Sequence, residues 1–206
     1  MKITRYIQSC LLVEQDGTRL LIDPSGEEGS PSKFGKLDAV IYTHEHADHF
    51  SPELNEQFVA AGVPVYANAS TAGQMKSQPN VVGDGQEFSV GALKIKAIEL
   101  PHCLLPDGSD GPQNTGYLIN GSLFHPGDGK ELDGLQVDNM ALPITGPDVS
   151  MKDCFAFAKQ VQAKVVIPIH YDKIGANPET YATFAGRFPQ FDYQFKILNV
   201  GQSAEL

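Results

Sequence analysis

The chain has 206 residues, 41% of them hydrophobic, which is enough to bury one sizeable core without a metal ion or a disulfide. Its 25 acidic residues outnumber its 15 basic ones and give a formal net charge of -10, so its surface repels nucleic-acid phosphates and anionic lipid headgroups. Composition therefore predicts one domain over residues 1–206, with neither nucleic acid nor membrane as a partner.

The first half of the chain is predicted to be rich in strands. Asp16-Gly17 favours a hairpin turn, because this pair readily adopts positive φ. Ser51 and Pro52 are typical of the start of a helix and Gly62 of its end, so a helix is expected over 52–61. The strands expected here alternate polar and apolar residues or are uniformly apolar, and they cover residues 2–8, 10–14, 18–23, 38–43, 87–100 with a break at 91, 114–120 and 122–125.

The second half is predicted to alternate strands with helices. The expected elements are a strand at 137–143, a helix at 151–162, a strand at 164–168, a helix at 178–187 and a last strand at 193–200. No internal repeat or convincing linker divides the chain. The sequence therefore predicts a single α/β layered fold.

Cysteine usage and the N-terminus bear on the compartment. The cysteines at positions 10, 103 and 154 are odd in number and widely spaced, which does not suit a disulfide framework. Only a short apolar stretch precedes Glu14, so we expect no signal peptide and no membrane span. These features predict a cytoplasmic protein.

Three of the six histidines lie close together in the segment Thr43-His44-Glu45-His46-Ala47-Asp48-His49. In an extended segment His44 and His46 point to the same side, so both imidazoles can bind one ion. Asp48 and His49 follow where the chain turns and can face a second ion, and this ligand set suits zinc. The alternative is a polar loop whose histidines cap the next helix or face solvent. The position directly after a strand, where α/β folds place ligands, favours the metal site.

The pattern Thr-His-x-His-x-Asp-His after an apolar strand resembles the signature of the metallo-β-lactamase superfamily. The resemblance implies a four-layer αββα sandwich of the α/β class. It continues at three later positions, His102, Asp128 and His170. The resemblance implies two metal ions, one held by His44, His46 and His102, the other by Asp48, His49 and His170, with Asp128 bridging them.

The segment 166–171 and the short tail after it are similar to those of small stand-alone hydrolases that include ascorbate-phosphate lactonase. This resemblance implies a small-molecule substrate and two divalent ions, zinc with manganese or iron as alternatives. We expect a metal-bound hydroxide to attack an ester, lactone, amide or phosphodiester bond. Asp48 is the expected catalytic residue, because a carboxylate beside the metal can orient the hydroxide and carry its proton. The sequence leaves lactonase, esterase and phosphodiesterase types open, as it does the oligomeric state.

Four further residues are weaker candidates around the expected site. Asp23 is expected to hold a ligand imidazole by a hydrogen bond. His125 could tune Asp128 in the same way or serve the fold. Tyr171 and Lys173 follow the last histidine and could contact a substrate oxyanion or phosphate, or have no specific role.

Two other classes of function stay open. The first is an iron-dependent thiol or persulfide oxidoreductase. Di-iron oxidoreductases of the superfamily have Glu where His46 stands, but iron dioxygenase relatives retain similar histidines. The second is a non-catalytic metal-binding protein, against which the full ligand set counts.

The loop 103–113 is expected to overhang the metals and to set substrate choice.

Overall fold

The computed structural model describes residues 1–173 and 175–206. In these residues, two seven-stranded mixed β-sheets form the centre of the molecule. The first sheet consists, in spatial order, of β14 (Ser203–Glu205), β1 (Lys2–Arg5), β2 (Leu11–Gln15), β3 (Thr18–Ile22), β4 (Ala39–Tyr42), β5 (Val65–Ala67) and β6 (Asn80–Val81). The second consists of β13 (Gln194–Phe195), β12 (Val165–Ile169), β11 (Asn139–Pro143), β10 (Leu123–His125), β9 (Thr115–Ile119), β8 (Leu93–Glu99) and β7 (Glu87–Val90).

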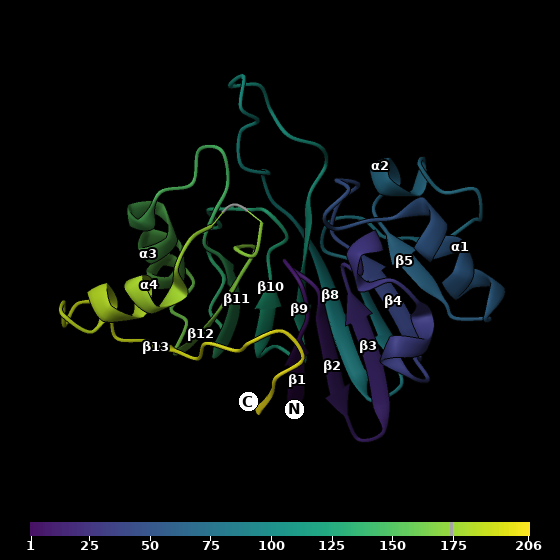
Figure 1. Cartoon of the computed structure of the whole chain (residues 1–206), viewed down its shortest axis with the longest axis horizontal. Coiled ribbons are helices and arrows are strands. Elements are labelled where there is room, and N and C mark those ends of the chain that lie inside the picture. The colour runs from purple at the N-terminus through teal and green to yellow at the C-terminus, as the bar shows by residue number, and fades with distance from the viewer. Residues whose placement is uncertain (174) are drawn as a thin grey trace.

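Helices cover the outer face of each sheet (Figure 1). On the side of the first sheet lie α1 (Pro52–Ala60) and α2 (Ala69–Ala72), and on the side of the second lie α3 (Met151–Gln160) and α4 (Pro178–Ala185). Two short 3-10 turns, η1 (Gly26–Glu28) and η2 (Pro31–Phe34), lie between β3 and β4. This order of layers confirms the predicted αββα sandwich.

The helices begin where local capping favours them. The Ser51 hydroxyl accepts a hydrogen bond from the Leu54 backbone N–H at 3.2 Å and so caps α1. At α3, Ser150 and Asp153 form a reciprocal capping box. The predicted helix starts are therefore confirmed, and each of these helices ends one to two residues before its predicted end.

The largest core lies between the two sheets. Alternate residues of β3 and β8 point into it, so that Leu20 and Ile22 of the first sheet pack in one cluster with Ile95 and Ala97 of the second. A second cluster lies under α3 and α4, and a third under α1. The fold therefore has apolar support on both sides of each sheet, independent of any ion.

The prediction of a last strand over residues 193–200 is wrong, because the strand there is much shorter and the chain then leaves this sheet. Only β13 is a strand there, and the chain then turns at Asn199 to Gln202, where Gly201 has a φ of 83°. The chain crosses to the other sheet, and β14 pairs antiparallel with β1. The reason is that β1 offers an unpaired edge to the chain end, a long-range partner that local sequence does not reveal.

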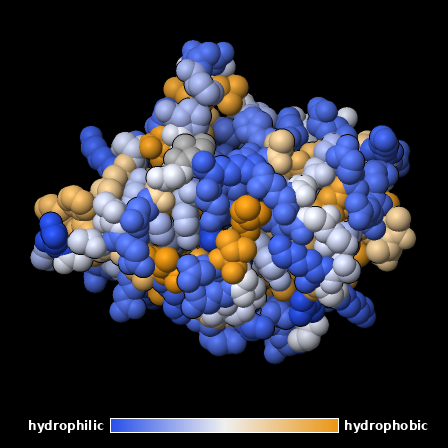
Figure 2. All heavy atoms as spheres, viewed as in Figure 1, coloured by the Kyte–Doolittle hydropathy of each residue, from blue (hydrophilic) through white to orange (hydrophobic). Residues whose placement is uncertain are grey.

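The face of the molecule drawn in Figure 2 is mainly polar, in keeping with the net charge of -10. Figure 2 shows hydrophilic residues over most of one face, with apolar residues in scattered patches. Among the described residues, no helix combines the length and the apolar composition that a membrane crossing requires.

Candidate metal centre

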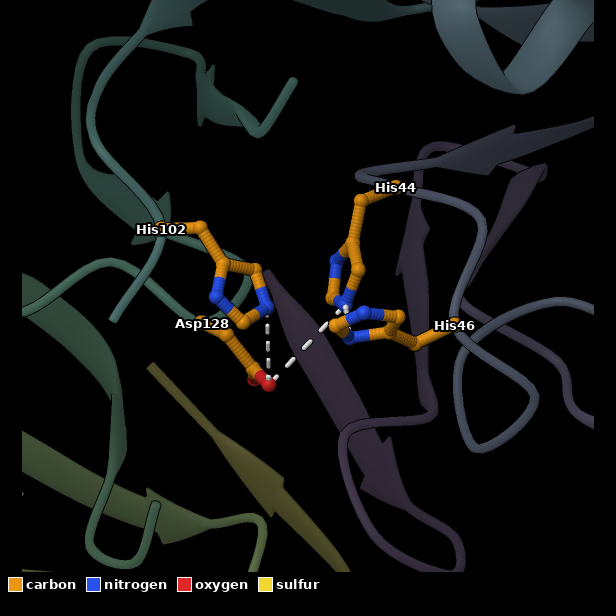
Figure 3. Close-up of side chains that lie close together, drawn as sticks. All are labelled: His44, His46, His102 and Asp128. Atoms are coloured by element: carbon orange, nitrogen blue, oxygen red, sulfur yellow. Dashed lines mark hydrogen bonds and ion pairs between the residues drawn. The ribbon is translucent and has the colours of Figure 1, made fainter. Parts of the chain in front are cut away.

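Seven side chains come together at one edge of the two sheets, where the strands β4, β8, β10 and β12 end. They form two groups, and the possible ligand atoms within a group lie within 4.8 Å of one another. Figure 3 shows the first group, with His102 and Asp128 on one side and His44 and His46 on the other. The groups consist of His44, His46, His102 and Asp128, and of Asp48, His49 and His170.

Asp128 joins the two groups. One of its carboxylate oxygens lies 3.1 Å from His49 Nε2, and the other lies 3.5 Å from His102 Nε2 and 3.4 Å from His170 Nε2. Its carboxylate thus faces imidazoles of both groups. This is the position that a bridging ligand requires.

A tight turn after β4 brings four of these side chains together. The backbone N–H groups of His49 and Phe50 both donate to the His46 carbonyl, at 2.9 and 2.8 Å. This turn folds Asp48 and His49 back beside His44. A local turn therefore produces both halves of the cluster from one short segment.

Asp23 holds this turn from beneath. Its buried carboxylate accepts hydrogen bonds from the Thr43 backbone N–H and hydroxyl, both at 2.7 Å, and from His49 Nδ1 at 2.9 Å. Because Nδ1 of His49 is engaged in this way, Nε2 is the nitrogen left to face Asp128. The structure thus gives Asp23 the hydrogen bond to a ligand imidazole that the sequence suggested.

The same arrangement recurs at three other histidines. His44 Nδ1 lies 3.0 Å from the Thr43 hydroxyl, which itself donates to Asp23, so Nδ1 is the donor. Nδ1 of His102 contacts the Cys103 carbonyl, and Nδ1 of His170 contacts the Thr145 carbonyl at 3.0 Å. A carbonyl oxygen only accepts, so both nitrogens carry the proton. In each ring Nε2 is therefore the nitrogen that faces the cluster and is available to a metal.

The residues fit a metal pair on their own chemistry. Three atoms of the cluster, Nε2 of His49, Nε2 of His102 and Oδ1 of Asp128, are buried without a hydrogen-bond partner among the described residues. Leaving buried polar atoms unpaired is costly, and metal ions would satisfy such atoms. Imidazole and carboxylate ligands of this number suit zinc and related divalent ions.

The electrostatics of the cluster follow from burial and from its mixed charges. Burial keeps the pKa of His44 well below its ordinary value, and burial likewise lowers the pKa of His46. Burial alone would raise the pKa of Asp128, but His49 and His170 outweigh it and hold that pKa well below its usual range. Burial alone would lower the pKa of His49 and of His170, but the Asp128 carboxylate outweighs it and raises both, so a metal ion would have to displace a proton from each of these two imidazoles.

The structure gives the three remaining weak candidates other partners. His125 is buried, with Nε2 at 2.8 Å from the Ser9 carbonyl and Nδ1 accepting from the Gly127 N–H at 3.3 Å, so it holds backbone rather than the Asp128 carboxylate. The Tyr171 hydroxyl donates to the Leu198 carbonyl at 3.3 Å.

Lys173 Nζ forms an ion pair with Glu27 at 2.5 Å. Tyr171 and Lys173 thus have protein partners, and a contact of either with a substrate stays a prediction.

Sequence reasoning missed several residues that contact the ligands. Gln8 Nε2 donates to Asp48 at 3.1 Å, and Asn114 Oδ1 accepts from the Asp128 N–H at 3.3 Å. Gly111 packs so closely on His102 that a Cβ there would lie 2.3 Å from Nδ1. Only Gly111 gave a signal, as a glycine in the loop expected to overhang the metals, because the other contacts are long-range.

Comparisons with known proteins agree on one group. A family model described as a beta-lactamase superfamily domain matches residues 2–170, the span that holds all seven clustered side chains. Protein Rv0786c of Mycobacterium tuberculosis is 30% identical over 199 residues and covers 92% of each chain. A UPF0173 metal-dependent hydrolase of Christiangramia forsetii is 26% identical over 232 aligned positions and covers 100% of each chain. The metallo-β-lactamase fold protein YhfI of Bacillus subtilis superposes with a TM-score of 0.73 at 17% identity, covering 98% of each chain, and so shares the fold.

Proposed function

We propose that the chain, which belongs to the beta-lactamase superfamily and has several relatives named metal-dependent hydrolases, is a binuclear zinc hydrolase of small-molecule substrates. The observation that carries the proposal is the shared orientation of four imidazoles. Each uses Nδ1 in a hydrogen bond within the protein and leaves Nε2 for the cluster. Such an arrangement fixes both tautomer and ring direction before any ion binds.

The ligands divide as the two groups do. His44, His46 and His102 would hold one ion, Asp48, His49 and His170 the other, and Asp128 would contact both. Two divalent ions, when bound, lower the pKa of a shared water toward neutrality and polarise the scissile carbonyl or phosphoryl oxygen. Zinc is our first choice of metal, and manganese and iron are the alternatives.

Asp48 is the residue we assign to proton transfer. Its side chain is 24% exposed, against 6% for Asp128, so it has the better access to an incoming water. Burial alone would raise its pKa, but the hydrogen bond from His170 and the charge of His49 hold that pKa well below its usual range. An ionised, partly exposed carboxylate accepts the proton that the attacking water loses and can return it to the leaving group.

His102 is the residue of the first group that lines a surface cavity of about 440 Å³. Its lining includes His102 together with Asp110 and Glu99. The two acidic side chains disfavour polyanions, so we propose a neutral or weakly charged ester, lactone or amide before a phosphodiester.

The cysteines support the cytoplasmic location that we propose. Cys10, Cys103 and Cys154 are all buried and all free. Burial raises the pKa of Cys103 to about 12 and that of Cys154 to about 12, so both thiols stay protonated and unreactive. Unpaired buried thiols are typical of a reducing compartment.

The test is hydrolysis by protein loaded separately with zinc, manganese or iron. The substrate panel contains lactones, esters, thioesters, amides and phosphodiesters. We expect hydrolysis of at least one class that depends on metal and disappears in His170→Ala. Fully loaded protein that hydrolyses none of them would contradict the proposal. Oxygen consumption with a thiol or persulfide, seen only in the iron form, would favour the oxidoreductase instead.

A further inference from the structure

The turn between β1 and β2 packs against the loop that follows His170. Gln8, at the centre of this turn, is fully buried. Its backbone N–H donates to Asp172 Oδ2 at 2.6 Å, and its carbonyl accepts from the His170 N–H at 3.0 Å. The start of the chain therefore fixes the backbone beside the last histidine.

The Gln8 side chain links this loop to Asp48. Its Oε1 accepts from the Lys173 backbone N–H at 3.1 Å, and its Nε2 donates to Asp48 Oδ2 at 3.1 Å. A backbone N–H only donates, so the carboxamide oxygen must face Lys173 and the NH2 group must face Asp48. The amide orientation is thus fixed by its partners. Because the Asp48 carboxylate is an ionised acceptor, this hydrogen bond is stronger than one between two neutral groups.

The backbone of Gln8 and His170 adopts conformations that non-glycine residues disfavour, and the fold maintains them. Gln8 has a φ of 54° and His170 a φ of 60°, a left-handed region that non-glycine residues disfavour. The two residues are hydrogen-bonded to each other. Such conformations persist where the surroundings over-determine them, and they concentrate at functional sites.

Buried charge holds the other side of the same loop. Arg5 is 1% exposed and forms an ion pair with Asp172. Its guanidinium also lies over the Tyr171 ring, 4.2 Å from the centroid. With Arg5 fixing Asp172 and Asp172 fixing the Gln8 N–H, the carboxamide has little freedom to leave Asp48.

We propose that Gln8 is a positioning residue for the second ion, holding the Asp48 carboxylate beside His170. This inference rests on the proposed two-ion function. His170 Nε2 already lies 3.2 Å from Asp48 Oδ2, so the two side chains assigned to that ion are adjacent. The hydrogen bonds of Gln8 go to Asp48 and to the loop around His170, on the side of the second ion, and its effect is therefore selective.

Two variants test the role. Gln8→Glu keeps the size of the side chain and an acceptor for the Lys173 N–H, but it puts a carboxylate oxygen against Asp48. Gln8→Leu removes both contacts. We expect each to bind the second ion roughly 10- to 100-fold more weakly, the usual effect of losing a group that orients a ligand, with the first ion unchanged.

The readout is the stoichiometry and affinity of cobalt(II) and zinc, measured by titration calorimetry and elemental analysis. Cobalt absorption spectra of His46→Ala and His170→Ala give references for loss of the first and the second ion. The spectra of the Gln8 variants should match His170→Ala. Gln86→Leu is the matched control, because Gln86 is exposed and its Oε1 accepts, within the described part of the chain, only from the Gly83 N–H at 3.1 Å.

The outcomes separate this role from the proposed function. Wild-type protein that never binds two ions would refute the two-ion function itself. Wild-type protein with two ions, beside a folded Gln8→Glu that binds both equally well, would refute only the role of Gln8. Equal weakening of both ions would also overturn it. If neither variant folds by circular dichroism and thermal melting, Gln8 belongs to the fold and not to the site.

Discussion

At the scale of single residues, the site is organised by hydrogen bonds that leave one atom of each ligand free. Asp23 engages Nδ1 of His49, and backbone carbonyls engage His102 and His170. Each contact removes one of the two nitrogens from competition, so the other is committed to the cluster. Replacing a ligand therefore has a different consequence from replacing the group that orients it.

The first prediction concerns Asp48. Asp48→Asn keeps the shape of the side chain but removes the charge that favours the metal and the oxygen that accepts a proton. Hydrolysis should fall by roughly 10²-fold or more, the usual effect of losing a positioned acid or base. The ion held by His44, His46 and His102 should be retained, as elemental analysis can show. Turnover near wild type with both ions bound would move the proton-transfer role to Asp128.

The second prediction concerns Gly111. A Cβ at this position would lie 2.3 Å from Nδ1 and 2.5 Å from Cγ of His102, so Gly111→Ala must displace the ring or the loop. The first ion should bind roughly 10-fold more weakly or worse, measured by zinc titration. Gly83→Ala is the control, since a Cβ there meets nothing within 4 Å. Equal affinity in the two variants would show that the loop yields without moving His102.

At the scale of elements, the seven clustered side chains follow the ends of strands from both sheets, and this is why much of the candidate site could be predicted. The segment after β4 carries a local motif, and single ligands follow β8, β10 and β12. The helix starts at Ser51 and Ser150 also depend on near neighbours, and they could be predicted.

The features that could not be predicted depend on contacts far apart in the chain. The pairing of β14 with β1 joins the two ends, and the Gln8 contact to Asp48 spans 40 positions. No local pattern marks either of them. The two 3-10 turns were also missed, because the segment 24–36 has the composition of an irregular loop.

The third prediction concerns the 3-10 turn η1 and its buried acid, Glu28. Burial raises the Glu28 pKa above 4.5, although the Ser25 hydroxyl donates to its carboxylate at 2.9 Å. In the unfolded chain the group ionises at the lower, ordinary pKa. The contribution of Glu28 to the free energy of unfolding is therefore largest below about pH 4.5. It is lost as the pH rises through the folded-state pKa of Glu28.

Glu28→Gln removes this ionisation. The melting temperature of the variant relative to wild type should accordingly be higher at pH 7.5 than at pH 4.5. Differential scanning calorimetry at the two pH values measures this. A difference of the opposite sign would mean that the folded protein stabilises the ionised form of Glu28.

At the scale of the whole molecule, the cluster joins the two halves of the sandwich. The segment after β4 belongs to the first sheet and supplies four of the clustered side chains, whereas His102, Asp128 and His170 come from the second sheet. Bound ions would therefore cross-link the sheets at one edge. The apolar cluster between the sheets joins the same two halves along their length. With ions bound, stability would thus be shared between the ions at one edge and the apolar core between the sheets.

The last prediction is that removal of metal abolishes activity but leaves the fold. Without ions, the ion pairs of Asp128 with His49 and His170, and that of Asp48 with His170, still hold the loops of the candidate site. An ion at 100 times its Kd contributes about 2.7 kcal/mol of stability. For a chain of this length, 1 kcal/mol corresponds to about 2–4 °C. Chelation should thus lower the melting temperature by roughly 5–10 °C per ion.

Thermal melting by circular dichroism, with and without chelator, measures this shift, and restoring zinc should recover both activity and melting temperature. The core supports this expectation, because the apolar clusters include residues of both sheets and of α1, α3 and α4, most of them away from the ligand loops. Complete unfolding on chelation at room temperature would mean that the ions, and not these clusters, hold the two sheets together. The centre would then be structural in the first place, and the proposed hydrolysis would lose its main support.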